Sequence, residues 1–290
     1  MTVPINLLKP DQKYWYARLM VSAILADGEI DKAEVEFLRQ VIGVVKEPGQ
    51  KVALMQLIES KQAPPIEEPP TSIPDQILAA IFVELMMVCI ADASFDQTEK
   101  NFLLQVAGMM RFTEAYTKSL LAWLEEGLNW KRTQAQLLPP ESGLTIGQIP
   151  VDRFTDAQKY WYAELIIATI LLNGKPDEFE MEMLKMIVNS VETKEEKMRL
   201  FGFVKNRLAP HLSPPPDLPQ DVLLLVLLNI IQVVTADEAI SYKEQTYLGQ
   251  VADICEIPTP VFSRLMAWAN QGIAWKNNKN GLITRVRRTG

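Results

Sequence analysis

Apolar residues recur every three or four positions along most of this chain, the spacing of one face of an α-helix. Alternating strand patterns are absent apart from a short extended tail expected near Leu282 and Ile283. The pattern therefore predicts an all-α fold. Its clearest helices are expected from Pro10–Asp11 to Ala26, from Val52 to Ser60 after a break at Pro48-Gly49, from Gln76 to Ala91 and from Glu114 to Trp130, with a helix after Asp31 that turns Val35, Phe37, Leu38, Val41 and Ile42 inward.

Proline clusters interrupt this helical pattern twice. Residues 62–74 contain five prolines in thirteen positions, which cannot continue a helix and predict a stiff, extended connector. A second cluster spans 210–219. The most apolar run, Val222 to Val234, is too short to cross a bilayer and predicts a buried core helix.

The sequence repeats itself with an offset of 145 or 146 residues. Lys13-Tyr14-Trp15-Tyr16-Ala17 reappears as residues 159–163, and Trp123, Gly127, Trp130 and Lys131 reappear as Trp268, Gly272, Trp275 and Lys276. We therefore expect two tandem helical domains, each made of two pseudo-symmetric helical halves joined by a proline-rich connector. The expected boundaries are domain 1 at 1–136, a linker at 137–150, domain 2 at 151–278 and a basic tail at 279–290.

Composition narrows the function classes. Apolar residues make up 48% of the 290 positions, and the net charge of −7 argues against a nucleic-acid-binding surface. Residues 1–150 hold 13 Lys and Arg against 19 Asp and Glu, so most of the acidic excess lies in the first half. Cys89 and Cys255 lie among apolar residues without CxxC spacing, and the N-terminus has no signal-peptide core, which predicts buried thiols in a cytoplasmic protein.

One acidic turn occurs four times, each time between an apolar helix and the next helix. The sixth residue of the turn and the Glu three positions later form a capping-box pattern in all four copies; the sixth residues are Asp31, Asp96, Asp177 and Ser241. Because Ser replaces Asp there in one copy, capping is the role that all four can share. The four turns are Ala26–Glu34, Ala91–Glu99, Leu172–Glu180 and Ala236–Glu244.

Capping does not explain the Asp that follows each apolar helix in the first domain. Asp27 and Asp92 lie at the C-terminal, unfavourable end of a helix dipole. Crowded carboxylates either raise their pKa values or bind a hard cation such as Ca²⁺ or Mg²⁺. An EF-hand is excluded, because Lys32 and Leu38 occupy the positions of its required Gly and Glu. The candidate cation ligands are Asp27, Glu29, Asp31, Glu34, Asp92, Asp96 and Glu99.

The apolar helix that ends in Ala26-Asp27-Gly28-Glu29, followed by a helix with Glu34 and the Phe37-Leu38 pair, resembles the TerB-like domain. This is the all-helical module of tellurite-resistance protein TerB and of the co-chaperone DjlA N-terminal region. The resemblance is strongest over 14–42 and 77–110 and weaker over 160–190 and 222–255. It implies a role in tellurite or stress response and a metal site at the acidic turns. The second domain departs from the pattern with Asn173 and Lys175.

Enzyme activity is not expected, because His211 is the single histidine and no nucleophile or phosphate-binding motif occurs. The leading hypothesis is a non-enzymatic scaffold that binds a divalent cation in domain 1. The alternatives are an adaptor without metal, whose acidic turns only cap helices, and an unrecognised hydrolase. Protein partners are expected. Trp123, Trp130, Trp268 and Trp275 either pack in the core or line a partner-binding groove, and the basic tail is a solvated end or a peripheral contact for anionic lipid.

Overall fold

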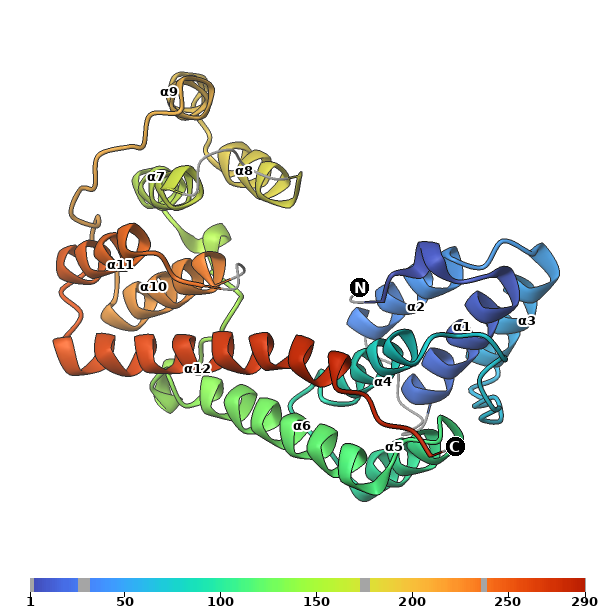
Figure 1. The fold of residues 1–290 in the computed structure, drawn as a ribbon. Coiled ribbons are helices and arrows are strands. Elements are labelled where there is room, and N and C mark those ends of the chain that lie inside the picture. The colour runs from blue at the N-terminus through green and yellow to red at the C-terminus, as the bar shows by residue number, and fades with distance from the viewer. Residues whose placement is uncertain (1–2, 26–31, 173–177, 236–238, 290) are drawn as a thin grey trace. The chain divides into compact units, whose positions relative to one another are not determined.

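The computed structural model describes residues 3–25, 32–172, 178–235 and 239–289 (Figure 1). Over these ranges the regular elements are helical, which confirms the all-α prediction. The α-helices are α1 (Pro10–Ile24), α2 (Lys32–Gly43), α3 (Pro48–Glu59), α4 (Asp75–Cys89), α5 (Gln97–Met109), α6 (Glu114–Ala135), α7 (Asp156–Leu172), α8 (Glu178–Ser190), α9 (Lys194–Asn206), α10 (Gln220–Val234), α11 (Tyr242–Ile254) and α12 (Thr259–Thr284). Short 3₁₀ turns lie at Ile5–Leu7, Pro140–Ser142 and Val151–Arg153.

The helices of the second half begin at the positions that the sequence offsets give. Helices α7 to α9 begin 146 residues after α1 to α3, and α10 to α12 begin 145 residues after α4 to α6. The chain divides into two compact units, unit 1 (1–131 and 277–290) and unit 2 (132–276). The boundaries between the units, at 131/132 and 276/277, fall inside α6 and α12. Helix α6 continues past Trp130, its expected end, and α12 continues past 278, the expected end of domain 2. The linker expected at 137–150 lies in unit 2, and the tail expected at 279–290 lies in unit 1.

Some expected helix ends were wrong by a few residues, for identifiable reasons. Helix α3 begins at Pro48, where a break was expected, because proline suits the first turn of a helix. Leu282 and Ile283 belong to α12 rather than to an extended tail, and the Tyr116 hydroxyl donates a 3.0 Å hydrogen bond to the Leu282 carbonyl. Val35, which was expected to face inward, is 39% exposed.

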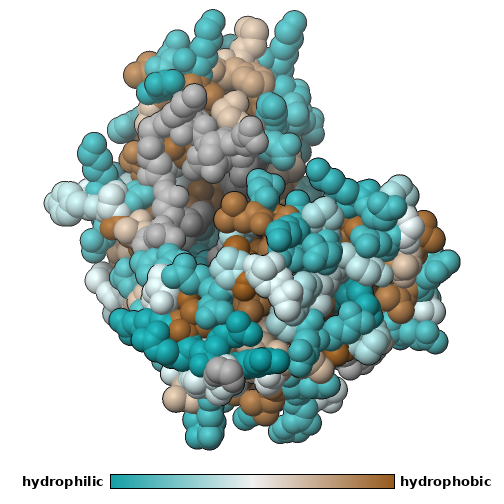
Figure 2. Space-filling model, turned by 45° about the vertical axis from the view of Figure 1, so that its right-hand side comes forward, coloured by the Kyte–Doolittle hydropathy of each residue, from teal (hydrophilic) through white to brown (hydrophobic). Residues whose placement is uncertain are grey.

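In each unit the first helix packs against several others, and the apolar fourth helix is largely buried. In unit 1, α1 packs against α2, α3 and α4, and every residue from Ile77 to Met86 on α4 is buried. In unit 2, α7 packs against α8, α9, α10 and α11, and α10 buries Leu223 to Leu228. The expected buried helix at 222–234 is therefore confirmed. On the face seen in Figure 2, hydrophilic residues predominate among the coloured residues, and hydrophobic ones are exposed in separate places.

A tryptophan fixes each proline-rich connector to the first helix of its unit. The Trp15 indole N–H donates a 3.0 Å hydrogen bond to the Glu67 carbonyl, and Trp161 donates a 3.0 Å bond to the Ser213 carbonyl. The connector carbonyls have no helical or sheet partner, so a side-chain donor satisfies them. In unit 1 the Arg18–Glu67 ion pair, at 2.7 Å, adds a second contact.

We expect Trp15→Phe and Trp161→Phe each to lower the free energy of unfolding by about 1–3 kcal/mol. An aromatic ring remains at each position, but the connector carbonyl loses its N–H donor. Urea unfolding followed by circular dichroism measures this. Tyr14→Phe, on the same helix, is the control and should change the value by less than about 0.5 kcal/mol. Equal effects at Trp15 and Tyr14 would contradict the role given to the indole N–H.

Candidate functional site

The acidic turn after α4 lies within the described residues and has a well-defined hydrogen-bond pattern. Asp96 is the N-cap of α5: its side chain accepts from the Glu99 amide at 2.8 Å, and the Glu99 carboxylate accepts from the Asp96 amide at 2.8 Å. Ser241 and Glu244 make the same reciprocal pair at the start of α11. The capping interpretation is confirmed at these two turns.

The other two turns cannot be compared in this way. Asp27, Glu29 and Asp31 lie outside the described residues, as does the side chain of Glu34. The corresponding turn 173–177 of unit 2 also lies outside them. The separation of the Asp27 and Asp92 carboxylates, on which a shared cation would depend, therefore stays a prediction.

Asp92 has protein partners that account for its position. Its carboxylate accepts from the Ser94 amide at 2.8 Å and from the Ser94 hydroxyl at 2.8 and 2.7 Å, which closes a tight turn. The Lys131 ammonium lies near enough for the Asp92 charge to raise the pKa of this lysine, although burial, the larger effect, lowers it. The Ser94 donors thus hold the carboxylate that capping left unexplained, and a lysine lies near enough to interact with its charge.

Lys131 also closes the C-terminus of α4. Its Nζ donates to the Ile90 carbonyl at 2.8 Å and to the Ala91 carbonyl at 3.0 Å, a favourable place for a cation at the negative end of a helix. In unit 2, Lys276 donates to the Thr235 carbonyl at 3.2 Å, 145 residues further on. Lys131 and Lys276 repeat together with the tryptophans, which marked both lysines in the sequence. The repeat alone did not predict that they contact helix-end carbonyls.

Among the residues that the structure describes, no three His, Cys, Asp or Glu side chains form a group that could hold a metal ion. Asp92, Asp96 and Glu99 share one turn but are used by Ser94 and by the helix N-terminus. These three candidate ligands thus lie within eight residues of one another and make local hydrogen bonds.

Three of the four candidate partner-binding tryptophans are buried. Trp123, Trp268 and Trp275 are each 4% exposed, and Trp130 is half-buried. These positions fit the core-packing alternative better than a groove open to a partner.

Unit 1 buries an acidic side chain that the sequence analysis did not single out. Glu84 on α4 is 5% exposed and lies beside Tyr16. Burial, and secondarily the Glu84 charge, raises the pKa of Tyr16. At the equivalent place in unit 2, the Tyr162 hydroxyl donates to the Asn229 side-chain oxygen at 2.9 Å. The two units therefore differ at matching core positions, with a carboxyl group in unit 1 and a side-chain amide in unit 2.

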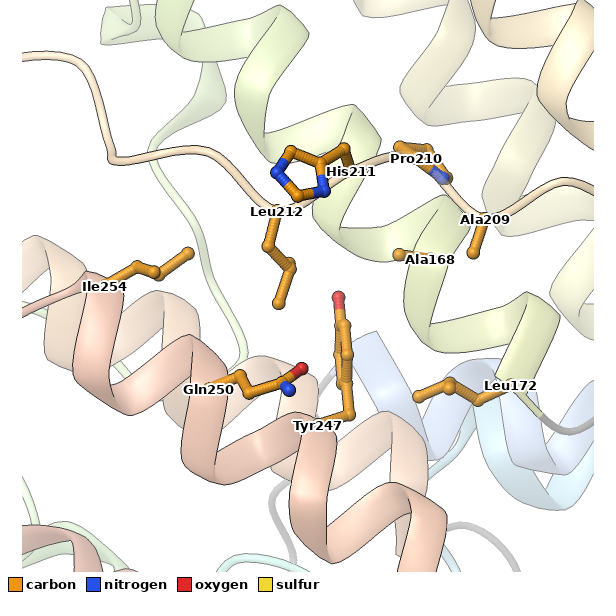
Figure 3. Close-up of a pocket in the computed structure, with 9 residues that line it drawn as sticks. All are labelled: Ala168, Leu172, Ala209, Pro210, His211, Leu212, Tyr247, Gln250 and Ile254. Atoms are coloured by element: carbon orange, nitrogen blue, oxygen red, sulfur yellow. The ribbon is translucent and has the colours of Figure 1, made fainter.

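A pocket of about 570 Å³ lies in unit 2 between α7, α11 and the proline-rich connector (Figure 3). In Figure 3, Leu212 reaches into it from the connector and the Tyr247 side chain from α11. The Tyr247 hydroxyl hydrogen-bonds the Leu165 carbonyl at 3.0 Å, and burial raises the pKa of Tyr247 to about 12. Ala168 lies in the wall, whereas its unit 1 equivalent Ser22 donates a 2.9 Å hydrogen bond to the Pro64 carbonyl.

His211, the single histidine, is exposed at the rim of this pocket. Cys89 and Cys255 are free and buried, and burial raises the pKa of Cys255 to about 12. A thiol with so high a pKa is a poor nucleophile at neutral pH.

Exposed apolar residues occur at the same place on the third helix of each unit. Val52 and Met55 on α3 are 53% and 51% exposed. Their equivalents on α9, Met198 and Phe201, are 63% and 53% exposed. We call these the third-helix pairs. The sequence analysis did not identify them, although both helices show apolar residues three apart on the side opposite their buried leucines.

No family model, no curated protein and no solved structure matches this chain. In the part of the chain described, every helix is too short or too polar to cross a membrane.

The capping role of Asp96 is tested by copying the other unit. Asp96→Ser reproduces Ser241, so we expect the free energy of unfolding to change by less than about 0.5 kcal/mol. Asp96→Ala removes the acceptor and should cost about 1 kcal/mol in urea unfolding. A loss as large for Asp96→Ser as for Asp96→Ala would show that the charge itself is needed.

Because Ser94 donates to both Asp92 oxygens and Lys131 lies near this carboxylate, we expect wild-type protein and Asp92→Asn to take up Ca²⁺ or Mg²⁺ to the same extent in a calorimetric titration. Lys131→Gln is the matched variant, because it removes the positive side chain near Asp92. Stoichiometric uptake by the wild type that disappears in Asp92→Asn would contradict this account and restore the cation site.

Proposed function

We propose that this chain is a non-enzymatic interaction scaffold whose two units each present an apolar docking face, the third-helix pair. Residues three apart on a helix lie on one face, so each pair forms a continuous patch. One exposed apolar side chain is ordinary on a protein surface. The observation that carries the proposal is the same exposed pair at equivalent positions of both units.

The pairs are not a by-product of core packing. Each third helix has its own buried anchor, Leu54 on α3 and Leu200 on α9, both fully buried. The anchor satisfies the need of the helix for a packed side, so the apolar pair on the outer side has no structural task within its unit. Apolar surface left in water is costly, and a partner that covers it recovers that free energy.

The proposal keeps the non-enzymatic scaffold of the leading hypothesis and leaves out the cation that the TerB-like resemblance implies, because Ser94 already donates to both Asp92 oxygens. A place in tellurite or stress response rests on the resemblance alone. A cytoplasmic location is supported by the two buried free thiols. The absence of catalysis is supported by the position of His211 at an exposed rim and by the raised pKa of Tyr247, whose hydroxyl does not serve as a base at neutral pH.

Photo-crosslinking in the cells of origin tests the scaffold. A photoreactive amino acid at Met55 and, separately, at Phe201 should give the same discrete protein adduct, because the two faces are equivalent. Asn101 and Thr246, exposed equivalents on α5 and α11, are the matched controls and should not give it. Different adducts at Met55 and Phe201, adducts shared with the controls, or none at all would contradict a duplicated docking face.

A further inference from the structure

The segment after α12 packs on unit 1 through its backbone. The Thr113 amide donates to the Arg287 carbonyl at 3.0 Å, and the Thr289 amide donates to the Arg111 carbonyl at 2.8 Å. These bonds make an antiparallel bridge between Phe112 and Arg288. The end that was expected to be solvated is therefore held by one antiparallel bridge against the α5–α6 corner.

Arg288 joins two charged or polar groups of unit 1. Its Nε donates to the Met110 carbonyl at 2.8 Å, and a terminal nitrogen of its guanidinium donates to the Asp75 carboxylate at 2.8 Å. Met110 is the C-cap of α5, where a cation is favoured, and Asp75 is in the first turn of α4, where an anion is favoured. Both helix ends thus prepare the site for a guanidinium.

Unit 2 closes the same place without an arginine. Gln220, the equivalent of Asp75, donates to the Cys255 carbonyl at 3.1 Å and to the Glu256 carbonyl at 3.3 Å. Cys255 is the equivalent of Met110, so the helix-end carbonyl is satisfied from within unit 2. Asp75 is a carboxylate and has no proton to donate, so the Met110 carbonyl needs a donor from elsewhere.

We infer that unit 1 contains an arginine-recognition site, formed by the Asp75 carboxylate, the Met110 carbonyl and the backbone edge 111–113, which binds an extended, arginine-bearing peptide end from a partner protein in place of the chain's own tail. The rigid fork of an arginine reaches the carboxylate and the carbonyl together, whereas a lysine presents a single point charge. Added-strand pairing supplies backbone hydrogen bonds, and the arginine supplies specificity.

The tail holds this site loosely enough to be exchanged. Arg285, Arg287 and Thr289 are exposed, and the Arg288 and Asp75 side chains keep 28% and 51% of their surface. Segments with few buried contacts open at small free-energy cost. The tether favours the tail, because a short linker gives an effective concentration on the order of millimolar. A partner peptide therefore competes only when it binds tightly or when the tail is weakened. This inference does not depend on the third-helix pairs.

The test uses the full-length chain and a fluorescein-labelled peptide, Thr-Arg-Val-Arg-Arg-Thr-Gly, which copies residues 284–290. By fluorescence anisotropy, the Arg288→Ala protein should bind this peptide at least about tenfold more tightly than wild type, because its own tail no longer competes. Adding Asp75→Gln to that variant should weaken binding about tenfold or more. Asp75→Gln copies Gln220 of unit 2, so the fold should tolerate it.

Two matched peptides separate recognition from general charge attraction. A peptide with Ala in place of the arginine that corresponds to Arg288 should lose binding, and one with Ala in place of that corresponding to Arg285 should keep it, although both have the same charge. Equal binding of the two peptides, or equal binding by wild type and Arg288→Ala, would overturn the site.

Hydrogen exchange checks the cis contact without any added peptide. The Thr113 and Thr289 amides should exchange about tenfold faster in Asp75→Gln than in wild type, while Glu114→Gln, an exposed neighbour, should leave them unchanged. Unchanged protection in Asp75→Gln would show that Asp75 does not hold the arginine, and would also overturn the inference.

Discussion

Backbone carbonyls that no helix or sheet can pair must find a donor, and this constraint organises both units. Proline-rich connectors and helix C-termini leave many such carbonyls, since proline supplies no N–H and the last turn of a helix has no following amide. Side chains answer it: a tryptophan at each connector and a lysine at the end of each apolar fourth helix. These donors tie segments that are far apart in sequence to the core helices.

Comparison of the two units shows where the constraint is met in different ways. The connector and lysine contacts occur in both, so they belong to the fold. The donors to the carbonyls at the ends of α5 and α11 differ. In unit 2, Gln220 donates to the Cys255 carbonyl. In unit 1, Asp75 cannot donate, and Arg288 donates to the Met110 carbonyl and to Asp75 itself. The difference of one amide for one carboxylate turns a closed helix end into a place that accepts a guanidinium.

Much of the fold could be predicted from the sequence because helical spacing and capping are local. Most of the expected helix starts, the capping pair Asp96 and Glu99 and the buried helix at 222–234 follow from residues within a few positions of one another. The distant neighbours, Lys131 near Asp92 and Asp75 at Arg288, could not be predicted in this way. Lys131 is 39 positions from Asp92 and Asp75 is 213 positions from Arg288, so packing brings each pair together.

The acidic turn at Asp92 and the third-helix pairs differ in whether contacts within their own unit explain them. The Asp92 carboxylate already accepts from the Ser94 hydroxyl on both oxygens and lies near Lys131, so its position is explained without a cation. The third-helix pairs lack such an account, because Leu54 and Leu200 already anchor α3 and α9 and leave the outer sides without a packing role. The fold does not need these exposed apolar pairs, yet both units have them at equivalent positions. This is why we propose that a partner binds there.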